Sequence, residues 1–308
     1  MRLVFMGTPD YAVPSLRRLC EVHDIIMVYT QPDRPKGRGY QLSASPVKQE
    51  ALALGIPVRQ PKSLRSSEEQ EFLKVLAPDA IVVIAYGLIL PQAVLDIPRF
   101  GCINAHGSIL PKYRGPSPMQ EAILQGDDET GVTTQQMDAG IDTGDILLIG
   151  RTPLAEKTID VLHDELAEMS AELLLITLEG IAQGVVQPIP QDDAQASYTR
   201  KIQKADGLIH WDASAEHILR QWRAYRIWPG ITTQWDGLTI KLTNLEQLNE
   251  TSSQSPGTVI QVCDAGINVA TGEGVVRITE LQPPGKRAMS VADYLRGNAL
   301  REGTNLGE

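Results

Sequence analysis

Residues 3–29 read LVFMGTPDYAVPSLRRLCEVHDIIMVY, a pattern that predicts a strand, a helix and a second strand. The two apolar runs are Leu3–Met6 and Ile25–Tyr29, and the residues from Tyr11 to Glu21 have helical spacing between them. Such a βαβ unit implies a parallel sheet with right-handed crossovers. The turn Gly7-Thr8-Pro9 lacks the glycine pattern of a dinucleotide site and the lysine of a P-loop, so neither site is predicted.

Further elements extend this α/β pattern to about residue 188. The continuous apolar run Ala80–Ala85 is typical of a central parallel strand that is buried on both faces. The other segments with helical or strand patterns are helices at 46–54, 68–76, 118–124 and 158–183 and strands at 131–136 and 145–151. We therefore predict a Rossmann-like catalytic domain over residues 1–188.

The second half of the chain has a different pattern. Residues 189–205 are polar and contain Pro190, so they read as a linker. Asp212 or Ser214 can cap a helix that ends near Arg226. Short apolar runs at 232–235, 239–242, 257–263, 267–270 and 275–281 follow, separated by turn residues. This spacing predicts a smaller β-barrel domain over residues 206–308.

The bulk composition excludes some classes of protein. The chain has 308 residues, of which 42% are hydrophobic and 21% charged, as expected for a globular protein with one large or two medium domains. Its net charge of −10 argues against a generic nucleic-acid binder, because affinity for phosphates needs a basic surface. A local basic patch on an acidic body stays possible.

The three cysteines, Cys20, Cys102 and Cys263, are far apart and form no metal-binding or disulfide pattern, so no metal is expected. Free thiols indicate a reducing compartment. The N-terminus begins directly as a strand without a signal peptide, and no apolar run reaches the roughly 20 residues of a membrane helix. We therefore expect a cytoplasmic protein that does not span a membrane.

Three polar residues are candidates for catalysis. Asn104 and His106 are two residues apart, so on a strand both point to the same face. An Asn amide can donate to an oxyanion, and a His can carry a proton. Asp142 lies in a later glycine-bounded turn and could orient the histidine. The same residues also fit ordinary roles, since Asn and Asp often cap turns and a lone His is often structural.

The residues around these candidates resemble a known family. Asn104–Gly115 reads NAHGSILPKYRG and Met137–Asp145 reads MDAGIDTGD, and both runs resemble the folate-dependent formyltransferase family. The closest resemblance is to members that act on charged initiator tRNA. It implies that Asn104, His106 and Asp142 are catalytic. It also implies transfer of the formyl group of 10-formyltetrahydrofolate, without a metal, to the α-amino group of methionyl initiator tRNA for translation initiation.

The resemblance also implies binding residues. It places the pterin pocket at the carboxyl ends of the strands, along Ser108, Ile109, Leu110 and Pro111 and near Tyr86 and Leu90. Simple core packing is an equal alternative for the apolar residues at 88–90. The basic segment Thr30–Lys48 matches an insertion loop that reaches the tRNA acceptor stem, and an irregular, mobile loop is expected there. The residues expected to contact tRNA are Arg34, Lys36, Arg38 and, in an OB-like C-terminal domain, Arg223.

Other functions stay open at this stage. The same chemistry could act on an amino sugar nucleotide or on another small amine such as glycinamide ribonucleotide. A folate hydrolase is a further relative, and a module that binds tRNA or folate without chemistry is an alternative from another class. The sequence has no clear signal for an oligomer, and we expect a monomer.

Overall fold

The structure, a computed structural model, describes residues 1–36 and 41–307. Its chain divides into two compact units. Unit 1 comprises residues 1–118, 129–153 and 162–199, and unit 2 comprises residues 119–128, 154–161 and the chain from residue 200 onward. Two short segments that precede residue 162 therefore belong to the C-terminal unit, and no feature of the sequence predicted this assignment.

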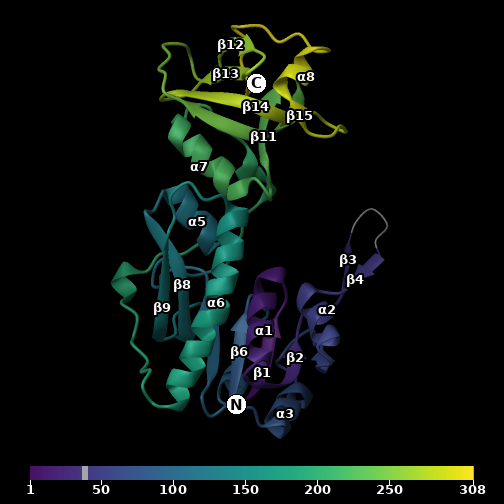
Figure 1. The fold of residues 1–308 in the computed structure, drawn as a ribbon, viewed down its shortest axis with the longest axis vertical. Helices are drawn as coiled ribbons and strands as arrows, with labels where there is room; N and C mark the ends of the chain where they lie inside the picture. The colour runs from purple at the N-terminus through teal and green to yellow at the C-terminus, as the bar shows by residue number, and fades with distance from the viewer. Residues whose placement is uncertain (37–40, 308) are drawn as a thin grey trace. The chain divides into compact units, whose positions relative to one another are not determined.

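Unit 1 is built on one mixed sheet with the strand order β5-β2-β1-β6-β7-β8-β9 (Figure 1). The strands from β5 to β7 are parallel, and β8 and β9 are antiparallel to their neighbours. This confirms the predicted parallel α/β fold. The strand bounds are β1 Arg2–Gly7, β2 Asp24–Tyr29, β5 Val58–Arg59, β6 Ala80–Ile84, β7 Cys102–His106, β8 Glu129–Gln136 and β9 Ile146–Pro153.

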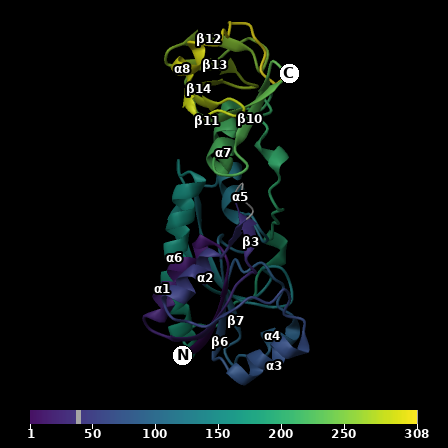
Figure 2. The ribbon, with the colours of Figure 1, turned by 90° about the vertical axis from the view of Figure 1, so that its right-hand side faces the viewer.

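Helices cover both faces of this sheet. In Figure 2, α1, α2 and α6 lie on one side of the strands and α3 and α4 on the other. The helix bounds are α1 Val13–Cys20, α2 Pro46–Ala53, α3 Ser67–Leu76, α4 Gln92–Leu95 and α6 Ile159–Ala182. The apolar cluster on the α3 side includes Val4, Met6, Ile81 and Val83, which alternate along β1 and β6 as strand geometry requires.

Strand β7 is the element that positions the candidate site. It pairs in parallel with β6 and antiparallel with β8, so it lies where the sheet changes direction. All five of its residues are buried. Cys102 packs into the apolar cluster on the α3 side, and the period of two therefore places Asn104 and His106 on that same face.

The basic segment 30–48 differs from the irregular loop that we predicted. Strand β3, Arg34–Lys36, pairs antiparallel with β4, Gln41–Ser43. The expectation of irregular backbone was wrong for these six residues, because prolines and glycines dominate the local pattern while the pairing of the two backbones forms the strands. The mobility of the segment stays a prediction. Arg38 falls at 37–40, outside the described residues.

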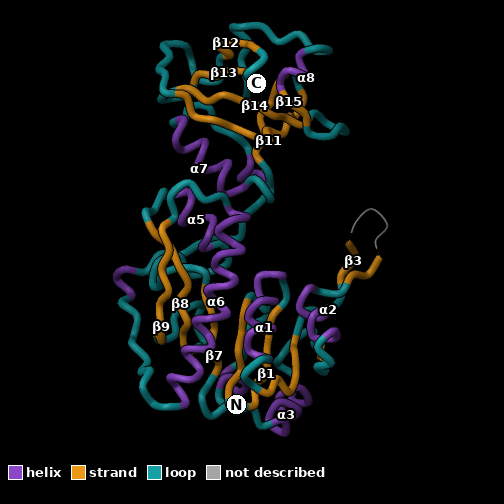
Figure 3. Tube along the Cα trace, viewed as in Figure 1, coloured by secondary structure: helices purple, strands orange, loops and turns teal. Residues whose placement is uncertain are grey.

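Unit 2 is an antiparallel β domain with the strand order β10-β11-β14-β13-β12, and β15 pairs with β14. This confirms the small β domain predicted for this half, and Figure 3 shows its strands in orange. Ser214 caps helix α7 by accepting a hydrogen bond from the backbone of His217. The bounds are α5 Pro118–Gln125, α7 Ala215–Tyr225, β10 Ile231–Trp235, β11 Leu238–Leu248, β12 Val259–Cys263, β13 Gly266–Ala270, β14 Val275–Gln282, β15 Met289–Ser290 and α8 Val291–Leu295.

Over residues 1–36 and 41–307, the longest helices remain too short or too polar to cross a bilayer.

Burial of Cys102 generates a prediction about alkaline stability. Burial raises the pKa of the Cys102 thiol to about 12, with a smaller contribution from Asp96. The unfolded chain loses this proton above about pH 8.5, whereas the folded chain keeps it, so the unfolded state binds fewer protons. The free energy of unfolding should therefore fall as pH rises above this value, by about 1.4 kcal/mol per pH unit from this one group.

The variant Cys102→Ala lacks the thiol and should be less stable than the wild type at pH 8, because it leaves a small cavity. The difference should narrow by about 1.4 kcal/mol per pH unit above pH 9, measured by urea unfolding. A constant difference from pH 8 to pH 10 would contradict the assignment.

Candidate active site

Asn104, His106 and Asp142 meet in space although 38 residues separate the first from the last. Asn104 and His106 project from β7, and Asp142 reaches them from the loop between β8 and β9. The Asn104 Nδ2 atom lies 3.5 Å from Asp142 Oδ1. The His106 Nδ1 atom lies 3.6 Å from Asp142 Oδ2. A carboxamide, an imidazole and a carboxylate therefore converge at the end of a sheet strand.

The Asp142 carboxylate is held by two further groups. The backbone N–H of Gly115 donates to Oδ2 at 2.8 Å, and the Gln135 side-chain amide donates to Oδ1 at 3.1 Å. Gln135 is opposite Asn104 in the β7–β8 register and is almost completely buried. The sequence reasoning missed Gln135 and Gly115. A polar residue at a buried strand position was the only signal for Gln135, and a backbone donor leaves no side-chain signal.

The hydrogen bond of His106 defines which ring nitrogen can exchange a proton. Its Nε2 atom lies 2.9 Å from the backbone carbonyl oxygen of Tyr113. A carbonyl can only accept, so Nε2 carries the hydrogen and donates it. The other nitrogen, Nδ1, faces Asp142. In this hydrogen-bonding arrangement Nδ1 is therefore the ring nitrogen whose lone pair is available.

Two residues of this site have unusual backbone conformations. Tyr113 has a φ of 62° and Asp142 a φ of 54°, in the left-handed region that residues other than glycine rarely adopt. Tyr113 thereby directs its carbonyl at His106, and Asp142 its carboxylate at the pair on β7. Such conformations persist only where surrounding contacts determine them, and they gather at functional sites.

The residues predicted to line a pterin pocket have different exposures. Ser108, Leu110, Tyr86 and Leu90 are buried, and the last two belong to the apolar cluster on the α3 side. Ser108 donates to the backbone carbonyl of Lys112 at 2.6 Å. Ile109 and Pro111 are half-buried and keep some accessible surface. Contact of these six residues with a pterin stays a prediction.

The predicted tRNA contacts also differ in how they are held. Arg34 is exposed and donates to the side chain of Gln31 at 3.2 Å. Lys36 is the last residue of β3. Arg223, by contrast, is only 12% exposed and pairs with Glu156 at 2.8 Å, so its charge is already neutralised inside unit 2. Contact of any of them with RNA stays a prediction.

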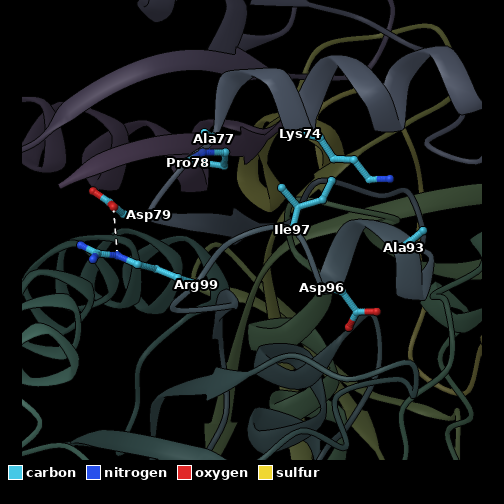
Figure 4. A pocket seen from close by; sticks show the side chains of 8 residues that line it. All are labelled: Lys74, Ala77, Pro78, Asp79, Ala93, Asp96, Ile97 and Arg99. Carbon is cyan, nitrogen blue, oxygen red and sulfur yellow. Dashed lines mark ion pairs between the residues drawn. The ribbon is translucent and has the colours of Figure 1, made fainter.

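One hollow of about 560 Å³ lies beside α3 and α4 (Figure 4), and none of the three candidate residues lines it. Lys74, Asp96 and Arg99 line it, and Arg99 pairs with Asp79. Among residues 1–36 and 41–307, no three His, Cys, Asp or Glu side chains gather as metal ligands would.

Comparison with known proteins covers almost the whole chain. Residues 1–178 match the family described as formyl transferase, and residues 201–299 match its C-terminal domain. The chain is 46% identical over 309 aligned residues to the methionyl-tRNA formyltransferase of Hydrogenovibrio crunogenus, covering 100% of this chain and 99% of that protein. It is 48% identical to the methionyl-tRNA formyltransferase of Marinobacter nauticus, covering 96% of each.

Solved structures share the fold at lower identity. HypX from Aquifex aeolicus in complex with tetrahydrofolic acid matches with a TM-score of 0.63 and 21% identity, over 96% of this chain and 47% of that one. The N-formyltransferase from Helicobacter canadensis in complex with folinic acid and dTDP-3-aminofucose matches with a TM-score of 0.68 and 19% identity, over 91% and 98%. This chain thus spans about half of HypX.

The close approach of Gly115 to the backbone of Thr199 generates a prediction about stability. Gly115 has a φ of 107°, and a Cβ atom there would lie 2.9 Å from the backbone oxygen of Thr199. Gly115→Ala should therefore lower the free energy of unfolding by more than the ~1–2 kcal/mol expected for a left-handed residue alone. Gly184→Ala is the matched control, because Gly184 has a φ of 73° with nothing within 4 Å of its Cβ position. Equal losses in urea unfolding would contradict the close approach.

Proposed function

The chain belongs to the formyl transferase family, and we propose here which of its residues carry out the transfer and which bind the substrates. The protein is an enzyme that formylates methionyl-tRNA, as its close relatives are named for doing. The formyl donor that we propose is 10-formyltetrahydrofolate. One observation supports the proposal above all: the side chains of Asn104 and His106 lie 3.5 Å and 3.6 Å from the carboxylate oxygens of Asp142.

In the proposed reaction the α-amine of methionine attacks the formyl carbon. A carbon–nitrogen bond forms to the amine, the bond to the folate nitrogen breaks, and one proton passes from the attacking to the leaving nitrogen. Asn104 donates to the oxyanion of the tetrahedral intermediate. Its contact with Asp142, at 3.5 Å, is at the outer limit of a hydrogen bond, so the amide is weakly held and can donate elsewhere.

His106 provides positive charge and the proton site in this proposal. With Nε2–H bonded to the Tyr113 carbonyl, a proton on Nδ1 makes the ring an imidazolium next to the carboxylate of Asp142. That charge stabilises the nearby oxyanion, and the Nδ1 proton is positioned for transfer.

For the folate donor we propose that direct contact is made by the half-buried pair Ile109 and Pro111. Ser108, Leu110, Tyr86 and Leu90 are buried, so their proposed role is to shape and stiffen the wall of the pterin pocket. Apolar walls and backbone amides suit a flat heteroaromatic ring.

For tRNA we propose contacts from the β3–β4 segment through Arg34, Lys36 and Arg38. An arginine can pair with a phosphate through two N–H groups or stack on a base. Arg34 supports this role because it is exposed and its bond in the structure is to a neutral glutamine. Arg223 is the weaker candidate, because binding RNA would require it to leave Glu156.

The substrate assignment predicts the outcome of a competition assay. Purified protein with 10-formyltetrahydrofolate should formylate charged initiator tRNA and should do so in the presence of an excess of a dTDP-amino sugar or glycinamide ribonucleotide. The discrimination follows from tRNA contacts that a small amine cannot make. Preferred formylation of either small amine would reject the assignment in favour of that substrate class.

The catalytic assignment predicts a large loss of rate in His106→Ala. Removal of one oxyanion donor typically lowers kcat by about 10²–10³-fold, and the same loss is expected for Asn104→Ala. His163→Ala is the matched control, because His163 lies on α6 and contacts Asp10 and Asp164. Single-turnover formylation rates would measure these effects, and a His106→Ala enzyme with full activity would refute the mechanism.

A further inference from the structure

Residues 189–199, which we name the strap, are not a free linker. In Figure 3 they form part of the trace that follows α6, which is teal except for a short helical turn in purple at Asp193–Gln195. Ile189 exchanges two backbone hydrogen bonds with Ile146 on β9, each of 2.8 Å. At the other end, Ser197 and Thr199 form backbone hydrogen bonds with Arg114, which lies in the loop after β7. Arg114 N donates to Ser197 O at 2.8 Å, and Thr199 N donates to Arg114 O at 2.7 Å. The strap therefore belongs to the structure around the active site.

Gln191 on the strap is bonded through both ends of its amide. Its Nε2 group donates to the backbone oxygen of Asp142 at 2.9 Å and to that of Gly144 at 2.6 Å. Its Oε1 atom accepts from Arg114 Nε at 3.1 Å and from Nη2 at 2.8 Å. A guanidinium can only donate and a carbonyl can only accept, so just one orientation of the amide satisfies all four bonds.

The Arg114 side chain, which bonds Gln191, is only 1% exposed, and a charged side chain is rarely buried to this extent. Its charge is balanced by Asp193 on the strap, to which Nη2 donates at 2.7 Å, and Nη1 donates to the Tyr198 hydroxyl at 3.0 Å. Burial alone lowers the pKa of Arg114, but the bonds to Asp193 and Tyr198 more than compensate and raise it. The guanidinium therefore stays charged and holds Gln191 in place.

The group that Gln191 binds is the strained backbone of Asp142. A left-handed conformation at a non-glycine residue is unfavourable and needs contacts that maintain it. Gln135 and Gly115 hold the carboxylate, but the peptide of Asp142 is bonded by Gln191. We propose that Gln191, oriented by Arg114, is a positioning residue that keeps the Asp142 carboxylate directed at His106 and Asn104. This inference rests on the proposed catalytic role of Asp142.

The test is the isosteric variant Gln191→Glu. A glutamate can still accept from Arg114, but it cannot donate to the two carbonyls of the Asp142 loop. Its kcat for formyl transfer should fall by about 10-fold to 100-fold, because small displacements of catalytic groups have effects of this size. KM for both substrates should change by less than about twofold, since Gln191 is proposed to act on Asp142 and not to bind either substrate. Gln191→Met, of similar length, should reproduce the loss without adding a charge.

Gln195→Glu is the matched control. It is the same chemical change on the same strap, but Gln195 is exposed and its amide donates to Asp192. This variant should keep the wild-type kcat. Thermal unfolding should give the same Tm for the wild type and all three variants within a few degrees.

Hydrogen exchange provides a second measurement that does not depend on catalysis. Backbone amides of residues 140–145 should exchange faster in Gln191→Glu and Gln191→Met than in the wild type, and no faster in Gln195→Glu. If the wild type transfers no formyl group, the proposed function fails while the exchange experiment still tests the strap. Unchanged exchange and unchanged kcat in both Gln191 variants would overturn the positioning role, as would a rise in KM at constant kcat.

Discussion

The hydrogen bonding of the Asp142 carboxylate is the constraint on which the candidate active site depends. A carboxylate placed beside a buried imidazole and a buried amide needs compensating donors, because an unsatisfied buried charge is costly. The donors come from the loop at Gly115, from Gln135 on β8 and, more weakly, from Asn104 on β7. Segments distant in sequence must therefore be in place together before the residue can act on His106.

This arrangement explains why strained backbone and buried charge occur in one small region. The left-handed residues Tyr113 and Asp142 direct a carbonyl and a carboxylate at the two nitrogens of one histidine ring. The buried Arg114 and the strap supply the opposing hydrogen bonds that make these conformations the stable ones. The fold itself therefore orients the polar groups of the candidate site, and the proposed electrostatic stabilisation requires such fixed orientation.

The pairing of the basic side chains limits which of them could attract a nucleic acid. A protein with a net charge of −10 can attract a polyanion only through local cations. In unit 2, Arg200, Arg220 and Arg223 are each paired with a carboxylate. Arg34 is bonded instead to a neutral glutamine at the base of the β3–β4 segment. Attraction to RNA would therefore depend more on exposed arginines that are not already paired than on the number of basic residues.

The local sequence was sufficient for most of the long elements, and together with the family resemblance it singled out the three central residues. The period of the apolar residues predicted α1, α6 and the buried strand β6, and the alternation along β7 placed Asn104 and His106 on one face. The composition of residues 189–205 suggested a linker. Only the tertiary structure revealed that the Gln191 side chain donates a hydrogen bond to the backbone of Asp142. Gln135 and the Gly115 N–H were likewise invisible, because such contacts are set by how distant segments pack and leave no periodic trace along the chain.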